Sequence, residues 1–350
     1  MKFTEAQLEA AIIQLLGDQG YPHLIGSNIE RGPSEVLIKS DLRVFLLKQY
    51  SDEGITDSEI DGIIRQLETL PASDLYESNK TFCKWLSDGF LLKREDHTQK
   101  DLYIQLIDYS GLEKMRLPKE GEVDILSARD IKEVSQRYTT NNLYKIVNQL
   151  EIEGTEKRIP DGILYINGLP LVLFEFKSAI REDATIHDAY LQITTRYRRD
   201  IPQLFVFNAL CVISDGVNNK MGTLFGAYDF YYGWRKITGD EVASKDGIDS
   251  LHTMLQGLFD QRRLREVIRH FIYFPDKTHQ DVKVICRYPQ YYAAMKLYQS
   301  IKEHQKKPDG TGGDGKGGTY FGATGCGKSF TMQFLARLLM KSVDFENLYR

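Results

Sequence analysis

Long apolar runs, paired cysteines and a large excess of charge of one sign are all missing from this 350-residue sequence. No run of about eighteen apolar residues occurs, which excludes a membrane-spanning helix and predicts no membrane partner. The opening segment, MKFTEAQLEAAIIQLLG, lacks a basic stretch followed by an apolar block, so we expect no secretory signal. Lysine and arginine number 45 against 49 aspartate and glutamate, a net charge of −4. The chain therefore does not bind nucleic acid by bulk charge, and any such contact requires a local basic face.

Cysteine is scarce and scattered. The four cysteines, Cys83, Cys211, Cys286 and Cys326, form no C-x-x-C pair, which argues against a zinc ribbon or a disulfide framework. Unpaired cysteines are typical of a reducing compartment, so we expect a cytoplasmic protein. A length of 350 residues with 42% hydrophobic residues predicts a globular chain of two or three domains.

The apolar pattern divides the chain into four segments. Residues 1–100 are predicted to be helical, beginning with a capping box at Thr4. In residues 101–245 the period approaches two, which predicts strands with an intervening helix and hence an α/β core. Residues 246–303 return to a helical pattern, and residues 304–350 begin with a Gly-rich loop. The predicted strands cover 102–107, 144–152, 162–166, 171–177 and 204–214, and the predicted helices after residue 100 cover 184–199, 251–259, 264–271, 291–303 and 329–340.

Two carboxylates and a lysine stand at the ends of adjacent predicted strands. Asp161 precedes the first strand, and Glu175 and Lys177 end the second, where they share one face because side chains alternate along a strand. The turn Asn167-Gly168 links the strands. A two-residue loop alone would pair Asp161 with Phe174, whereas a three-residue loop or a compensating bulge would place Asp161 opposite Glu175. If these groups form a site, we expect one of the latter two arrangements.

Asp161 and Glu175 would together offer hard oxygen ligands for Mg²⁺. The ion would acidify a water and neutralise charge on a phosphodiester, while Lys177 would orient that water and stabilise the pentacovalent phosphate. The alternative is an ordinary ion pair between Glu175 and Lys177 at the end of a strand. The apolar run Leu169–Phe174 favours a site, because it draws both charges toward the interior, where an ion pair is costly.

The segment IPDGILYINGLPLVLFEFKSA resembles the PD-(D/E)xK nuclease superfamily. The matching residues are Pro160, Asp161, Glu175 and Lys177. The segment Asn167–Val172 and the preceding Asn148-Gln149-Leu150 resemble the nuclease domain of the R subunit of type I restriction enzymes. This resemblance implies a Mg²⁺-dependent endonuclease that cuts double-stranded DNA. It also implies a complex in which a specificity subunit recognises the sequence and a modification (methyltransferase) subunit methylates it.

The same family carries a Gln-x-x-x-Tyr motif on the helix after the lysine. In this chain Gln192 is followed by Arg196 four residues later and by Tyr197 five residues later. The resemblance implies a catalytic role for Gln192, with either Tyr197 or Arg196 in the second position. In a regular α-helix the fifth residue does not share the face of the fourth, so Tyr197 would point away from Gln192.

Three arginines on this predicted helix, Arg196, Arg198 and Arg199, form a basic cluster. Such a cluster can contact the phosphates of a nucleic acid backbone. It is equally consistent with a solvated helix face, and both interpretations stay open.

Residues 322–329, GATGCGKS, match the phosphate-binding pattern G-x-x-x-x-G-K-[ST]. A strand is predicted over 319–321 and an apolar helix follows, which is the context that this motif requires. The glycines would let backbone N–H groups hold phosphates, Lys328 would reach the β and γ phosphates, and Ser329 would ligate Mg²⁺. The predicted ATP-binding residues are Gly322, Thr324, Gly325, Gly327, Lys328 and Ser329.

Upstream of this loop, ICRYPQYY resembles the adenine-reading Q motif of superfamily-two helicases. The resemblance implies that Gln290 contacts the adenine edge and that Arg287 packs near the base. The sequence stops at Arg350, one helix after the loop, without the acidic Walker B position that helps to hold Mg²⁺. We therefore expect a fragment of a longer protein or a truncated relative, with a loosely packed P-loop segment that neither translocates DNA nor turns over ATP efficiently.

The predicted fold class is α/β. We expect a helical N-terminal part, a PD-(D/E)xK restriction-endonuclease-like mixed sheet flanked by helices, and the first piece of a RecA-like P-loop lobe. The leading hypothesis is the nuclease and ATP-driven translocase subunit of a type I restriction–modification complex. Two alternatives stay open: a P-loop translocase whose nuclease-like domain only binds DNA, and a P-loop regulatory protein without a role on DNA.

Overall fold

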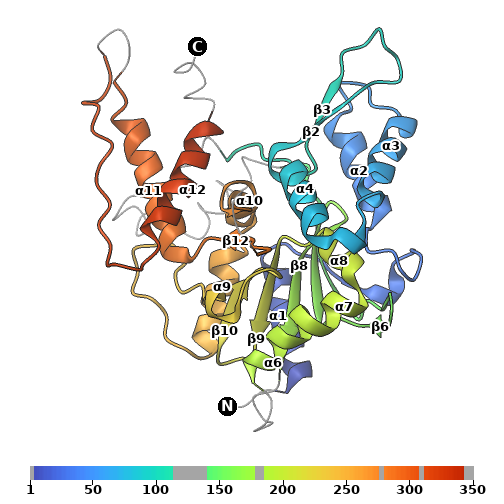
Figure 1. Cartoon of the computed structure of the whole chain (residues 1–350), viewed down its shortest axis with the longest axis horizontal. Coiled ribbons are helices and arrows are strands. Elements are labelled where there is room, and N and C mark those ends of the chain that lie inside the picture. The colour runs from blue at the N-terminus through green and yellow to red at the C-terminus, as the bar shows by residue number, and fades with distance from the viewer. Residues whose placement is uncertain (1–3, 113–139, 178–184, 276–279, 307–310, 343–350) are drawn as a thin grey trace.

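A six-stranded mixed sheet forms the centre of the computed structural model (Figure 1). The structure describes residues 4–112, 140–177, 185–275, 280–306 and 311–342. The strand order is β1-β4-β7-β8-β9-β10. The strands are β1 (His23–Ile25), β4 (Tyr144–Asn148), β7 (Gly162–Ile166), β8 (Leu169–Phe176), β9 (Leu210–Ser214) and β10 (Asn219–Gly222). The pairs β1–β4 and β8–β9 are parallel and the other three are antiparallel, which confirms a mixed sheet.

The hairpin of β7 and β8 contains the predicted compensating bulge. Asn167 and Gly168 form a two-residue turn with φ values of 54° and 76°, as the favoured hairpin turn requires. Ile166 pairs with Leu169, but beyond Leu164 the register shifts by one residue, and Gly162 pairs with Phe174. This shift places Asp161, just before β7, in register with Glu175.

The N-terminal part is mainly helical, as predicted, but β1 and β2 (Phe90–Leu92) are strands within residues 1–100, and β1 joins the central sheet. Thr4 caps the first helix through a capping box with Gln7, with hydrogen bonds of 3.2 and 3.1 Å. Thr56 caps the third helix in the same way with Glu59. The elements are α1 (Glu5–Asp18), η1 (Gly26–Asn28), α2 (Lys39–Gln49), α3 (Asp57–Glu68), η2 (Ala72–Asp74), α4 (Leu75–Asp88) and the two-stranded sheet of β2 (Phe90–Leu92) and β3 (Leu102–Ile104).

Helices cover both faces of the central sheet (Figure 1). One face contacts α6 (Ile186–Leu191), which continues through the π-helical turn η3 (Gln192–Tyr197) into α7 (Arg198–Asp200). On the other face lie α1 and α9 (Ile248–Leu258), where the ring of Phe174 is 5.3 Å from that of Phe259. Glu175 follows Phe174 in the strand and therefore points to the face of α6 and η3.

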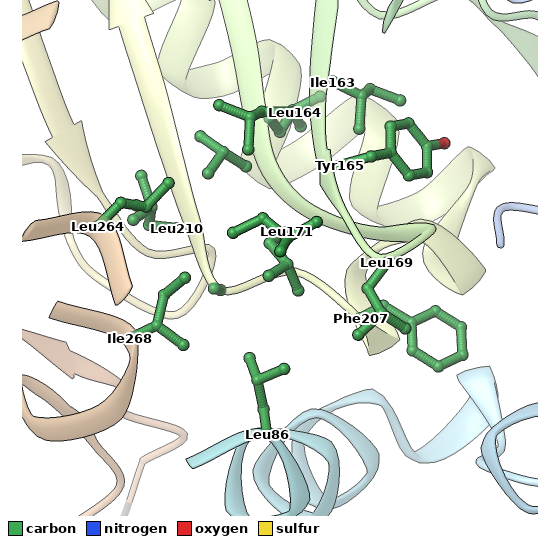
Figure 2. Close-up of a cluster of buried hydrophobic side chains, with 14 of the residues drawn as sticks. Leu86, Ile163, Leu164, Tyr165, Leu169, Leu171, Phe207, Leu210, Leu264 and Ile268 are labelled. Carbon is green, nitrogen blue, oxygen red and sulfur yellow. The ribbon is translucent and has the colours of Figure 1, made fainter. Parts of the chain in front are cut away.

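One end of the sheet is closed by helices from distant parts of the sequence (Figure 2). Leu86 of α4 and Ile268 of α10 (Gln261–His270) point toward Leu171 of β8, and Leu264 of α10 lies near Leu210 of β9. All five side chains are almost completely buried. This packing holds the β7–β8 hairpin rigidly between the N-terminal helices and the helical connector.

The C-terminal part packs against the rest of the molecule through α12 (Lys328–Met340). Phe334 of α12 is buried, with its ring 5.3 Å from that of Phe271. The expected loose packing of the P-loop segment is therefore wrong for the helix that follows the loop. The remaining elements of this part are β11 (Ile272–Tyr273), β12 (Val284–Ile285) and α11 (Tyr288–Glu303).

Three predicted strands differ from the structure. Residues 204–206 belong to the helix α8 (Pro202–Val206), which begins at Pro202, and only Leu210–Ser214 forms a strand. The predicted strand 144–152 breaks after Asn148, where Gln149 has a φ of 51°, and resumes as β5 (Ile152–Glu153), paired with β6 (Lys157–Arg158). Residues 319–321 are not a strand, because no strand among the described residues pairs with them. Residue 184 and residues 307–310 of the predicted loop lie outside the described residues.

None of the helices in the described ranges is long and apolar enough to cross a membrane.

Candidate active site

Asp161 and Glu175 meet at the end of the β7–β8 hairpin. The carboxylate oxygen Oδ2 of Asp161 accepts a hydrogen bond of 2.6 Å from the backbone N–H of Phe176. Glu175 lies on β8 with no exposed side-chain surface. The bulge in the hairpin thus joins the two acids that the sequence analysis paired.

Both carboxyl groups are held in surroundings that favour their protonated forms. Burial raises the pKa of Asp161 to about 6, although the hydrogen bond from Phe176 and the charge of Lys177 lower it. Burial raises the pKa of Glu175 to about 8, and the negative charge of Asp161 raises it further. Two neighbouring acids whose pKa values are both raised by burial are typical of a site that takes up a cation.

Lys177 contacts the same carboxylate from the next position on this face. Its Nζ donates a hydrogen bond of 2.8 Å to Oε1 of Glu175, and 15% of its side chain is exposed. The amine is therefore reachable from solvent, whereas the carboxylate that it binds is not.

The second oxygen of Glu175, Oε2, is buried and makes no hydrogen bond to any described residue. A buried carboxylate oxygen without a partner is costly, and a divalent cation would supply the missing partner. The residues therefore fit Mg²⁺, with Asp161 and Glu175 as carboxylate ligands. Within the ranges that the structure describes, no three side chains of histidine, cysteine, aspartate and glutamate form a metal cluster.

Gln192 and Tyr197 contact each other across the π-helical turn η3. The side-chain nitrogen Nε2 of Gln192 donates a hydrogen bond of 2.8 Å to the hydroxyl of Tyr197, whose own proton is directed to the carbonyl of Ile159 at 3.4 Å. In a π-helix the backbone hydrogen bonds join residues five positions apart. Gln192 and Tyr197, which a regular α-helix would point in different directions, therefore lie on the same side here. Tyr197 also lies close enough to Glu175 for that carboxylate to raise the pKa of its phenol, although burial is the larger cause.

Arg196, the other candidate for the second position of the motif, is exposed, and its side chain forms no hydrogen bond with that of Gln192, which bonds Tyr197 instead. Arg198 and Arg199 diverge as well. The guanidinium of Arg198 lies 5.4 Å from the ring centre of Phe225, whereas Arg199 is bound to Asp200. The three arginines are thus not one cluster.

Glu5 and Glu9 on α1 are residues near the site that the sequence analysis missed. Their negative charges raise the pKa of Asp161, after the larger effect of burial. Glu9 accepts a hydrogen bond of 2.7 Å from the amide of Asn148. The sequence does indicate that Glu5 and Glu9 lie together, because residues four apart share one face of a helix. The same spacing is also typical of a solvated helix face, so it does not by itself indicate a site.

The predicted ATP-binding residues form a second, separate group at the start of α12. Gly327 has a φ of 85°, and Lys328 donates hydrogen bonds of 2.8 and 2.9 Å to the carbonyls of Gly322 and Ala323. Thr324, Gly325 and Ser329 are exposed. The loop is therefore closed on itself by the lysine that the motif assigns to phosphate.

Gln290 connects α11 to this loop. Its side-chain oxygen accepts a hydrogen bond of 2.8 Å from the N–H of Arg287, and its nitrogen Nε2 donates one of 3.4 Å to the carbonyl of Gly327. The guanidinium of Arg287 lies 4.7 Å from the ring centre of Tyr232. Of the two residues of the predicted adenine-reading segment, Gln290 thus contacts the predicted phosphate loop, whereas Arg287 packs on Tyr232.

Comparison with known proteins finds relatives among the subunits of type I restriction enzymes. The family model described as the N terminus of the type I restriction enzyme R protein matches residues 2–230. The HindI endonuclease subunit of a type I restriction enzyme from Haemophilus influenzae is 29% identical over 98% of this chain and 31% of its own length. The SauCOLORF180P endonuclease subunit from Staphylococcus aureus is 24% identical over 87% of this chain and 28% of its own length.

A Methanocaldococcus jannaschii protein assigned to the same kind of subunit is 26% identical over 96% of this chain. The chain spans about a third of the length of these curated relatives. With the family model matching well over half of its residues, the chain belongs to the family of type I restriction enzyme R proteins, whose N-terminal region it represents.

Proposed function

We propose that this chain carries the Mg²⁺-dependent DNA-cleaving site of an R subunit. The observation that carries the proposal is the buried pair of Asp161 and Glu175, with Oε2 of Glu175 lacking a partner and Lys177 bound to Oε1. The relatives are named endonuclease subunits of type I restriction enzymes, and on this ground we propose double-stranded DNA as the substrate.

Each residue of the pair would have its own task in phosphodiester hydrolysis. Asp161 and Glu175 would hold Mg²⁺, which lowers the pKa of the attacking water and offsets the charge of the phosphate. The ammonium of Lys177, 2.8 Å from Glu175, would lie beside the reacting phosphate and stabilise its added negative charge. Gln192 and Tyr197 would fix the orientation of the buried carboxylate from the adjacent helix.

The same proposal includes an ATP-driven motor to which residues 322–329 belong. Its support is the complete sequence motif, the left-handed backbone of Gly327 and the start of α12 directly after it. Lys328 and Ser329 would hold the phosphates and Mg²⁺ of ATP, and Gln290 with Arg287 would lie near the base. Modification and specificity subunits would be the partners, since the relatives are named as subunits of type I restriction enzymes.

The test is cleavage of plasmid DNA by the assembled enzyme carrying Glu175→Ala. We expect cleavage to be lost while ATP hydrolysis continues. The matched control is Glu77→Ala, which removes an exposed carboxylate on α4. Cleavage that survives Glu175→Ala would instead favour the alternative in which this domain only binds DNA.

A titration with divalent ions distinguishes the proposed nuclease from the other alternative, a P-loop regulatory protein that does not act on DNA. Mg²⁺, or Ca²⁺ as a non-catalytic substitute, should raise the melting temperature of the chain, because an ion bound only by the folded state stabilises it. The shift should disappear in Glu175→Gln and persist in Glu77→Gln. An equal shift in all three proteins would count against a metal site at this pair.

A further inference from the structure

A pocket of about 460 Å³ lies between the β5–β6 hairpin and the η3–α7 segment. Its lining residues are Lys157, Arg158, Ile159, Gln192, Arg196, Tyr197 and Arg199. Four of the seven are basic and none is acidic. We call this set the basic pocket.

The basic pocket is built around one buried carboxylate. The side chain of Asp200 has no exposed surface and lies 2.6 Å from the guanidinium groups of both Arg158 and Arg199. One of these arginines comes from the hairpin and the other from the helix. Asp200 therefore holds both guanidinium groups in place by charge-assisted hydrogen bonds. The Arg158 and Arg199 side chains nevertheless remain 32% and 66% exposed, so both can still contact an anion.

The hairpin is pressed against the same residue through its backbone. Thr155 donates a backbone hydrogen bond of 2.8 Å to the carbonyl of Asp200. A Cβ atom on Gly154 would lie only 2.0 Å from that carbonyl oxygen, so the close approach requires glycine. The two walls of the basic pocket are thus fixed relative to each other.

Arg196 supplies charge that the protein does not balance. It is exposed, and it forms no ion pair or hydrogen bond with any residue in the described part of the chain. Lys157 is paired with Glu151 at 2.9 Å, and Arg158 and Arg199 share Asp200. Glu153 and Glu156 add negative charge near Lys157 and Arg199, so Arg196 is the pocket-lining cation that no described carboxylate pairs with.

The basic pocket adjoins the candidate active site. Tyr197 lines it and also lies beside Glu175, whose charge acts on its phenol. Ile159 lines it as well, and it precedes Asp161 by two residues, a span of at most about 7 Å of extended chain. An anion in the basic pocket would therefore lie next to the candidate active site of Asp161 and Glu175.

A second pocket provides the contrast. It is lined by Lys80 and Arg198 but also by Asp74, Glu77 and Asp281. Its mixed charge does not favour a polyanion. Arg198, two residues from Arg196 on the same helical segment, thus belongs to a surface of different character.

We propose that the basic pocket binds a phosphate of the DNA strand that is being cut, next to the cleaved bond, with Arg196 as its main free cation. This inference rests on the proposed nuclease function. A backbone phosphate fits better than a free nucleotide, because the cations are spread over two elements beside the reaction site and no glycine-rich phosphate loop lines the pocket.

The test compares Arg196→Gln with Arg198→Gln in the 350-residue chain. Binding to a fluorescent 20-base-pair duplex is measured by anisotropy in EDTA, so that no cleavage occurs, over a series of salt concentrations. Arg196→Gln should weaken binding by about tenfold and reduce the slope of log K against log salt by about 0.9, the value for one lost phosphate contact. Arg198→Gln should match the wild type, and Arg196→Lys should keep the salt slope. Melting temperatures of all variants verify that the fold is intact.

The outcomes separate this inference from the proposed function. If Arg196→Gln binds like the wild type while Glu175→Ala stops cleavage by the assembled enzyme, the pocket is refuted and the nuclease stands. Equal losses in Arg196→Gln and Arg198→Gln would also refute it, because they would reflect general charge. Calorimetry with inorganic phosphate addresses a free anion: Arg196-dependent phosphate binding without duplex binding would assign the pocket to a small anion and overturn the proposal.

Discussion

The side chain of Gln192 donates a hydrogen bond to the hydroxyl of Tyr197 at 2.8 Å, although the two residues are five positions apart on one helix. The π-helical turn between them makes this contact possible. Turns of this kind are frequent at functional sites. Here the turn delivers a phenol to the buried Glu175 and an amide to the wall of the basic pocket.

Gln192→Ala and Tyr197→Phe should each slow DNA cleavage by the assembled enzyme about 10–100-fold, as expected for groups that orient metal ligands. The double variant should be little slower than either single variant, because both changes remove the same hydrogen bond. Single-turnover cleavage of plasmid DNA provides the rates. Thr195→Ala, an exposed change in the same turn, is the control. Fully multiplicative effects would show that the two residues act independently.

Glu175→Gln should stabilise the metal-free chain at high pH. The pKa of Glu175 is about 8 in the folded state and near 4.5 when unfolded, so the unfolded chain ionises first and the wild type loses stability as the pH rises between these values. The glutamine variant does not have this loss. At pH 8 it should be more stable by more than about 1 kcal/mol, and the difference should shrink below pH 5.

Urea unfolding in EDTA at pH 4.5, 6 and 8 measures this pH dependence. Glu77→Gln, a change of the same kind at an exposed carboxylate, should parallel the wild type at every pH. A wild type more stable than Glu175→Gln at pH 8 would contradict the raised pKa.

Lys177→Ala should abolish cleavage by the assembled enzyme and spare its ATP hydrolysis, because the ammonium is bound to Glu175 and not to the phosphate loop. Removing it leaves Glu175 without the bond at Oε1 and withdraws positive charge from the reacting phosphate. Parallel assays of plasmid cleavage and phosphate release distinguish the two activities. Lys80→Ala, at a partly exposed lysine of α4, is the control for loss of charge.

Lys328→Ala should abolish both activities of the assembled enzyme. Lys328 is the lysine of the predicted ATP loop, and cleavage in this proposal requires ATP-driven translocation. Its amine donates hydrogen bonds to the carbonyls of Gly322 and Ala323, within the same loop. Cys326→Ser, an exposed change in the same loop, should retain both activities. Full cleavage by Lys328→Ala would refute the coupling of cleavage to the motor.

Gly168→Ala should destabilise the chain by at least about 3 kcal/mol. Gly168 has a φ of 76°, and a Cβ atom there would lie 2.1 Å from the carbonyl oxygen of Ile38. Gly54→Ala is a matched control, with a φ of 63° and open space around the added atom, and it should cost only about 1–2 kcal/mol. Urea denaturation provides both values, and equal costs would exclude the contact with Ile38 as the cause.

The sequence predicted the elements whose signals are local. The strand Gly162–Ile166 was predicted to the residue, and the bulge followed from the requirement that Asp161 face Glu175. The helix at residues 202–206 was missed, because an apolar run of four residues fits a buried strand as well as a helix. Pro202 at its first position was the available signal.

Features that depend on distant contacts could not be predicted in this way. A strand at residues 319–321 needs a neighbouring strand, which the described part of the chain does not supply. The π-helical turn and the approach of α1 to Asp161 are set by packing rather than by local propensity. The separation of Arg196 from Arg198 has the same origin, since Phe225 and the β5–β6 hairpin lie on different sides of the helix.

The extra residue in the β7–β8 hairpin constrains how homologous chains can diverge. With thirteen positions between the two acids, a two-residue turn and one bulge together set which way Glu175 points. Losing a single position anywhere in this interval, without losing the bulge as well, would turn the glutamate and lysine to the opposite face. A single insertion or deletion that keeps the bulge therefore separates the two acids, and only a second such change, or the loss of the bulge, brings them back to one face.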